Sequence, residues 1–166
     1  MTILTVGDPH AKVSNLEEMK SLILFIADIA SKRKVDRIEI LGDLFHNHAV
    51  LRLEVQELWT WALSLLSDIC ETVILTGNHD LSGDYKSTFS ALSMFALIGK
   101  KNLIIIEKPQ CLGVFGYVPY IHDPSDFVRS TKAINDCGAR VLVCHQTIQG
   151  SKYETGFYAH DGIDPE

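Results

Sequence analysis

The sequence has few cysteines, no long hydrophobic run and no excess of positive charge. Its cysteines are scattered and contain no CxxC pair, which excludes a disulfide framework and a zinc knuckle and indicates reduced core residues of a cytoplasmic protein. The most apolar stretch, residues 22–30, is too short to span a bilayer, so no membrane association is expected. The opening MTILTVGD leads directly into a predicted strand and does not resemble a signal peptide.

The net charge of −6 does not favour a nucleic-acid-binding protein, since such domains usually carry a basic face. It does not exclude one either, because bound metal ions invert the local charge of an acidic site. A length of 166 residues, with 46% hydrophobic and 22% charged residues, predicts one globular domain covering residues 1–166.

Apolar β-branched runs predict strands, and helical spacing of apolar residues predicts helices. The last part of the chain, residues 146–166, shows no periodicity and is expected to be loop. In the predicted helix 51–69, we expect the inward face to carry Leu53, Leu58, Trp61, Leu65 and Ile69. Strands are predicted at 2–6, 37–41, 72–76, 103–106, 111–118 and, as a buried strand, 140–144; helices are predicted at 16–33, 51–69, 88–98 and 125–137.

Four of the predicted strands end in side chains that can bind a metal. In TVILTGNHD, residues 72–80, the apolar run ends at Gly77, which allows a sharp turn, and an amide, an imidazole and a carboxylate follow. The carboxyl ends of strands are where open α/β sheets bind ligands. The polar residues at the four ends are Asp8 and His10; Asp43 and His46; Asn78, His79 and Asp80; and His145.

This set of oxygen and nitrogen ligands suits Mn²⁺, Fe²⁺ or Zn²⁺, and a shared carboxylate can bridge two ions about 3.5–4 Å apart. Such a pair would neutralise a phosphate and lower the pKa of bound water. Any one strand-end Asp or His could instead be a cap or turn residue, as could Asp8 or Asp43. Four such ends together favour a metal-dependent hydrolase.

The motifs Asp8-Pro-His10, Gly42-Asp43, Gly77-Asn-His-Asp80 and the strand-end His145 resemble those of the calcineurin-like metallophosphoesterases. That resemblance implies an α/β fold, a two-sheet β-sandwich flanked by helices. Within the superfamily, GDLFH at 42–46 and YVPY at 117–120 look most like the nuclease subunit of SbcD-type DNA repair and recombination exonucleases.

The resemblance also implies residue roles. His79 would be the catalytic histidine that is not a ligand, with Asp80 orienting it, and His46 would position substrate DNA. His48 has no motif counterpart and is expected to be a surface residue. Two divalent ions are implied. Mn²⁺ is the expected metal, with Fe²⁺, Zn²⁺ or Mg²⁺ as alternatives. One ion would be held by Asp8, His10 and Asp43, and the other by Asp43, Asn78 and His145, so that Asp43 bridges them.

The family's fifth motif, Gly-His-x-His, is absent, and Ala159-His160-Asp161-Gly162 does not match it. The C-terminal strands of the fold are therefore expected to be missing. The chain could be truncated, completed by a second chain or homo-oligomer, or diverged, with water or His160 taking the ligand position. The function implied is a phosphodiester hydrolase acting on DNA, with a coiled-coil ATPase as partner. A phosphatase or small-molecule phosphodiesterase, and an inactive scaffold fragment, are the alternatives.

Overall fold

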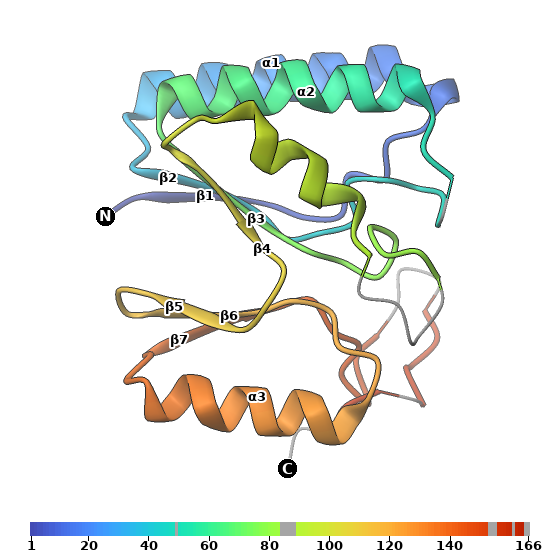
Figure 1. Cartoon of the computed structure of the whole chain (residues 1–166), viewed down its shortest axis with the longest axis vertical. Helices are drawn as coiled ribbons and strands as arrows, with labels where there is room; N and C mark the ends of the chain where they lie inside the picture. Colours follow the sequence, from blue (N-terminus) through green and yellow to red (C-terminus); the bar gives the residue numbers. More distant parts are fainter. Residues whose placement is uncertain (49, 84–88, 153–155, 161, 165–166) are drawn as a thin grey trace. The chain divides into compact units, whose positions relative to one another are not determined.

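The computed structural model describes residues 1–48, 50–83, 89–152, 156–160 and 162–164 (Figure 1). The chain forms two compact units, Met1–Glu107 and Lys108–Glu166, which are described separately. Each contains one sheet, and helices occur in both, several in the first unit and α3 in the second, so the mixed α/β class with two sheets is confirmed. Sandwich packing of the two sheets and the single domain both stay predictions.

The first unit is built on a four-stranded parallel sheet whose strands follow one another in chain order. Its helices α1 and α2 lie next to each other along one side of the sheet (Figure 1). The strands are β1 (Ile3–Val6), β2 (Arg37–Ile40), β3 (Glu71–Leu75) and β4 (Leu103–Ile106); the helices are α1 (Leu16–Arg33), α2 (Leu53–Ile69) and the 3₁₀ helices η1 (Val13–Asn15) and η2 (Ala91–Ile98).

The register of this sheet aligns the carboxyl ends of its strands. Val6 pairs with Ile40, Ile40 with Ile74, and Ile74 with Ile105. The apolar runs of β3 and β4, residues 73–75 and 103–106, suit a parallel sheet, whose strands are buried by crossover helices. The loops that follow β1, β2 and β3 therefore start from one row of residues and leave the sheet at the same edge.

The hydrophobic core of the first unit lies between the two long helices and the sheet. One prediction about it is wrong, because Leu53 and Trp61 do not face inward: their side chains are 77% and 38% exposed. The buried aromatic of α2 is Trp59, which is 2% exposed and donates its indole N–H to the main-chain oxygen of Leu44 at 3.0 Å. The core of α2 thus connects directly to the loop that follows β2.

The predicted helix 88–98 corresponds to η2, which begins at Ala91; residue 88 lies outside the described residues. Ser90 caps η2 by accepting a hydrogen bond from the main-chain N–H of Leu92 at 3.0 Å. A serine with extended backbone before the first turn is a favoured N-cap.

The second unit contains a three-stranded sheet in the order β5-β6-β7. The predicted strand 111–118 is in fact a hairpin, because Gly113, with φ of 62°, turns the chain between two antiparallel strands. The predicted strand 140–144 forms, but half of it is exposed, since β7 is an edge strand of its sheet. The elements are β5 (Gln110–Leu112), β6 (Phe115–Val118), α3 (Pro124–Asp136) and β7 (Val141–Cys144).

Within residues 146–164, the described part contains isolated bridges but no regular strand or helix, as the lack of periodicity predicts. Among the described residues, every helix is too short or too polar to cross a bilayer.

Candidate metal centre

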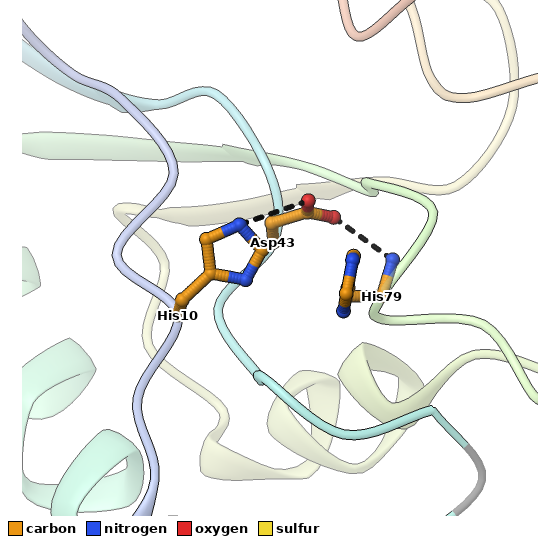
Figure 2. A group of neighbouring side chains, drawn as sticks. All are labelled: His10, Asp43 and His79. Atoms are coloured by element: carbon orange, nitrogen blue, oxygen red, sulfur yellow. Dashed lines mark hydrogen bonds and ion pairs between the residues drawn. The ribbon is translucent and has the colours of Figure 1, made fainter. Parts of the chain in front are cut away.

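Loops from β1, β2 and β3 bring three side chains together at the carboxyl edge of the first sheet. Figure 2 shows His10, Asp43 and His79, each from a different loop, directed toward one another. One ligand atom from each lies within 4.8 Å of the others. A carboxylate oxygen of Asp8 also lies within 4.8 Å of one from Asp43. Two predicted ligands of the first unit, Asp8 and His10, thus lie near Asp43, together with His79.

Asp43 is 4% exposed and contacts the other two loops directly. Its Oδ2 lies 3.5 Å from Nε2 of His10, and its Oδ1 accepts the main-chain N–H of His79 at 2.9 Å. One carboxylate therefore joins the ends of β1, β2 and β3, which is the position that a bridging ligand would need.

The backbone at the site adopts conformations that side chains rarely take. His10 and Asp43 have φ of 48° and 53°, in the left-handed region. The main-chain N–H of His10 donates to the carbonyl of Asp43 at 2.9 Å, and that of Ala11 donates to the carbonyl of Leu44 at 2.9 Å. These bonds hold the two loops together and offset the strain, which proteins retain mostly at functional positions.

Gly77 is required by a close approach of the chain. A Cβ added there would lie closer than 3.0 Å to both Oδ1 and N of Asp43. At Gly7, which follows β1 in the same way, an added Cβ would meet nothing within 4 Å. The glycine after β3 therefore lets the loop that carries His79 close over Asp43.

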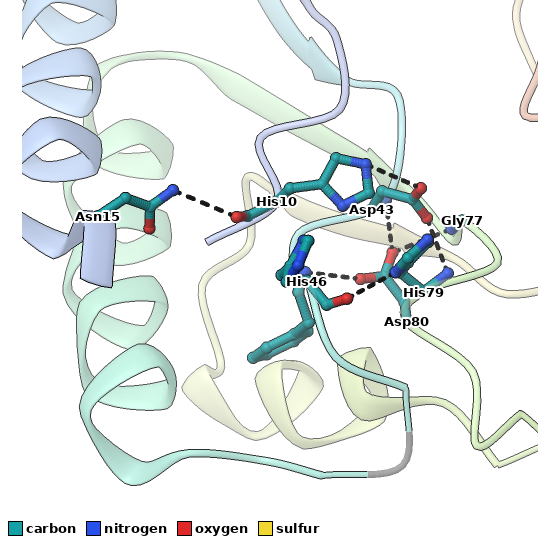
Figure 3. A network of polar contacts seen from close by, with 8 residues as sticks. His10, Asn15, Asp43, His46, Gly77, His79 and Asp80 are labelled. Atoms are coloured by element: carbon teal, nitrogen blue, oxygen red, sulfur yellow. Dashed lines mark hydrogen bonds and ion pairs between the residues drawn. The ribbon is translucent and has the colours of Figure 1, made fainter. Parts of the chain in front are cut away.

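Asp80 accepts hydrogen bonds from the main chain of the site (Figure 3). Its Oδ2 accepts the N–H groups of Asp43 at 2.9 Å and Gly77 at 3.0 Å, and its Oδ1 accepts that of Phe45 at 3.2 Å. The expectation that Asp80 orients His79 stays a prediction, and the hydrogen bonds described for its carboxylate all come from main-chain amides. Burial, at 1% exposure, raises the pKa of Asp80 to about 6, while the amide donors oppose that shift.

The contact that orients His79 comes from the main chain of His46. Nδ1 of His79 lies 2.7 Å from the carbonyl oxygen of His46. Because a carbonyl only accepts, Nδ1 must carry the proton of the neutral ring, so Nε2 is left for another partner. The tautomer of His79 is thus set by the loop that follows β2.

The residues present fit a divalent metal. Nδ1 of His10 is buried and has no hydrogen-bond partner among the described residues. Such an atom is uncommon in a folded protein and suggests a missing ligand. Burial lowers the pKa of His10, which favours the neutral ring that metal binding requires. Imidazole and carboxylate donors at this spacing suit the borderline divalent ions.

Other predicted roles are not decided by the geometry. His79, predicted to be a non-ligand, has a ring nitrogen close enough to share an ion with His10 and Asp43. Asn78 lies half-buried in the same loop, and its ligand role stays a prediction. His145 directly follows β7 in the second unit, and its ligand role also stays a prediction.

One residue near the site was missed. His48 stacks on His79, with ring centroids 4.0 Å apart and planes inclined by 29°. The ring of His46 is farther away, at 6.2 Å from His79. The signal was present in the sequence His46-Asn-His48, which places a second imidazole in the short loop after β2.

Comparison with known proteins identifies related sequences. The family model described as "Calcineurin-like phosphoesterase" matches residues 1–161. The chain is 30% identical to "Putative phosphoesterase 244L" of Invertebrate iridescent virus 6 over 157 residues, covering 90% of this chain and 55% of that protein. It is 29% identical to "Putative phosphoesterase 078R" of Invertebrate iridescent virus 3 over 163 residues, covering 92% and 46%.

The chain thus spans about half the length of these relatives. Among solved structures, the "Crystal structure of Pseudomonas putida nuclease MPE" matches with a TM-score of 0.43 and 20% identity, over 74% of this chain and 54% of that one. This likeness is too weak to carry a conclusion.

Proposed function

Because the chain belongs to the calcineurin-like phosphoesterase family, we propose that it is a metal-dependent phosphodiester hydrolase that acts on DNA. The observation that carries the proposal is the convergence of His10, Asp43 and His79 from three loops at one edge of the sheet. The GDLFH sequence at 42–46 supports DNA as the substrate through its resemblance to SbcD-type nucleases. On the same resemblance, a coiled-coil ATPase is the proposed partner.

Asp8, His10 and Asp43 would hold one divalent ion, and Asn78 would serve a second, with Mn²⁺ proposed for both. When bound, these ions neutralise the phosphate and lower the pKa of the attacking water. Asp43 contributes charge at the centre of the cluster, where only 4% of its surface is exposed. Removing water from around a carboxylate strengthens its attraction for a cation.

The proposed role of His79 is to hold a phosphate oxygen or protonate the leaving group. Its Nδ1 is held by the main-chain oxygen of His46 at 2.7 Å, so the ring can accept or donate a proton only at Nε2. A positioned acid of this kind contributes about 10²–10⁴-fold to a rate. His46 keeps its side chain exposed beside this contact, which suits a group that meets the substrate.

The test is a manganese-dependent assay that compares linear double-stranded DNA, bis-p-nitrophenyl phosphate and p-nitrophenyl phosphate. Faster turnover of DNA and the diester supports the proposal. A preference for the monoester would assign a phosphatase instead, and no turnover of any substrate would favour a scaffold.

The role of His79 is tested by His79→Ala, with metal content measured by mass spectrometry on the same sample. We expect turnover to fall by at least about 100-fold while the metal content stays at the wild-type value. Loss of bound metal would show that His79 is a ligand, which its distance from His10 and Asp43 allows. His122→Ala, at an exposed position of the second unit, is the control. His145→Ala should lower the metal content if it is a ligand.

His46→Ala tests the role of the His46 side chain apart from that of its main chain. The carbonyl that holds His79 is retained, so metal content and turnover of the small diester should change little. The KM for DNA should rise, because the variant lacks the group proposed to contact DNA. An equal loss on both substrates would contradict that role.

A further inference from the structure

His48 makes a specific contact with the proposed catalytic histidine although no motif includes it. Its ring lies against the face of His79 with centroids 4.0 Å apart, closer than any other ring contact described in the chain. The planes are inclined by 29°, so the rings meet face to face and not edge to face.

The loop after β2 therefore contacts the ring of His79 at one edge and on one face. The main-chain oxygen of His46 meets Nδ1 at 2.7 Å along one edge of the ring, and His48 covers one face. A hydrogen bond at a single nitrogen fixes the tautomer but still lets the ring tilt about that bond. A second ring stacked on the face restricts the tilt. The two contacts together determine where Nε2 points.

The loop that follows His79 passes near His48. A Cβ added at Gly83 would lie 3.5 Å from Cβ of His48, so the backbone of Gly83 is close by. His48 thus lies on the loop after β2 and near the loop after β3, both of which carry proposed site residues.

We propose that His48 is a positioning residue that holds the ring of His79 in its working orientation by stacking. The inference rests on the proposed function of His79. It requires a flat ring at position 48 and no proton transfer by that ring, so another aromatic side chain should replace it. An imidazole that relayed protons could not be replaced by phenylalanine.

The kinetic test uses the full chain with manganese and the small diester. Aromatic pairing contributes modestly, so His48→Ala should lower kcat about 3- to 10-fold and leave KM and metal content unchanged. His48→Phe should restore most of kcat, whereas His48→Leu should not. Asn47→Ala, a change at the neighbouring exposed position of the same loop, should behave like the wild type. Equal losses in the Ala and Phe variants, a change confined to KM, or an unchanged kcat in His48→Ala would each overturn the proposal.

A second measurement separates this inference from the proposed function. In histidine-labelled protein with magnesium in place of paramagnetic manganese, the ring protons of His79 should be shifted upfield by the stacked ring. That shift should disappear in His48→Ala and persist in His48→Phe. If the protein hydrolyses no phosphate ester, the proposed function fails and the spectrum still reports the stacking. If the shift is the same in the wild type and His48→Ala, the stacking is refuted even when the enzyme is active.

Discussion

Replacing Asp80 with alanine should destabilise the first unit strongly, even in the absence of metal. The Asp80 carboxylate accepts the buried N–H groups of Asp43, Phe45 and Gly77, at 2.9, 3.2 and 3.0 Å. A buried donor that loses its partner costs about 1–3 kcal/mol, so three donors cost at least about 3 kcal/mol. Since domains are stable by about 5–15 kcal/mol, this is a large fraction of the total.

Urea unfolding in the presence of a chelator measures this effect without a contribution from bound metal. Both tryptophans, Trp59 and Trp61, lie on α2, so their fluorescence reports the first unit. With a slope of about 1–3 kcal/mol per molar urea, the midpoint of Asp80→Ala should fall by about 1–3 M. As the control, Asp28→Asn removes an exposed ion pair with Lys32 and should change the urea midpoint by at most a few tenths of a molar.

Asp80→Asn tests the same three hydrogen bonds with a smaller change than Asp80→Ala. Asp80→Asn keeps one oxygen that can accept from two amides, but its NH₂ group must face the third donor. The loss should therefore be smaller, at about 1–2 kcal/mol. If the alanine variant unfolds at the wild-type midpoint with an unchanged slope, Asp80 does not support the loops in the way that its contacts indicate.

The remaining predictions concern the first unit and its metal. Gly77→Ala should abolish metal binding and lower the melting temperature, because its Cβ would clash with Asp43. Gly7→Ala, where an added Cβ meets nothing, should bind metal normally. Calorimetric titration compares the metal affinities of the two variants, and equal affinities would contradict the clash. Trp59→Phe should lose about 1 kcal/mol of unfolding free energy with its buried hydrogen bond, and Trp61→Phe should lose less; chemical denaturation followed by circular dichroism checks the order. A chelator should lower the melting temperature of metal-loaded protein, since metal present at 100 times its Kd stabilises the folded state by about 2.7 kcal/mol. An unchanged melting temperature would indicate that the folded state binds no ion.

The strands of the first unit were predictable because their apolar residues are followed by residues that favour turns. The predicted strands 2–6, 37–41, 72–76 and 103–106 agree with β1 to β4 to within one residue at either end. Glycine and polar residues after the first three runs mark where the chain leaves the sheet. Strand–helix alternation and short connections then leave little choice but a parallel sheet.

The inward face of α2 was not predictable from its spacing. Apolar residues occur on nearly every side of this helix, so a period of 3.6 residues fits more than one face. The structure buries Trp59, and Leu53 and Trp61 are exposed. On the buried face, the carbonyl of Leu44 accepts the indole N–H of Trp59. A partner in a distant loop leaves no periodic trace in the sequence.

The gathering of strand-end residues around Asp43 was predictable and their contacts with one another were not. Residue types at strand ends pointed to Asp43 and His79, and the family resemblance implied that Asp80 orients His79, which stays a prediction. The hydrogen bond described at the ring of His79 goes to a main-chain oxygen of His46, and every residue except proline offers the same amide and carbonyl groups. His48 carried a usable signal in its spacing from His46, although spacing alone does not show which ring it meets.

The strand order of the first sheet bears on how the protein is made. Because β1 to β4 lie side by side in the order of synthesis, each new strand joins the one translated just before it. Residues 1–80 already contain three of the four strands and every proposed site residue of this unit. A nascent chain could therefore arrange these loops before β4 has emerged from the ribosome. Limited proteolysis of stalled nascent chains, lengthened in steps past residue 80, would reveal when this region becomes protected.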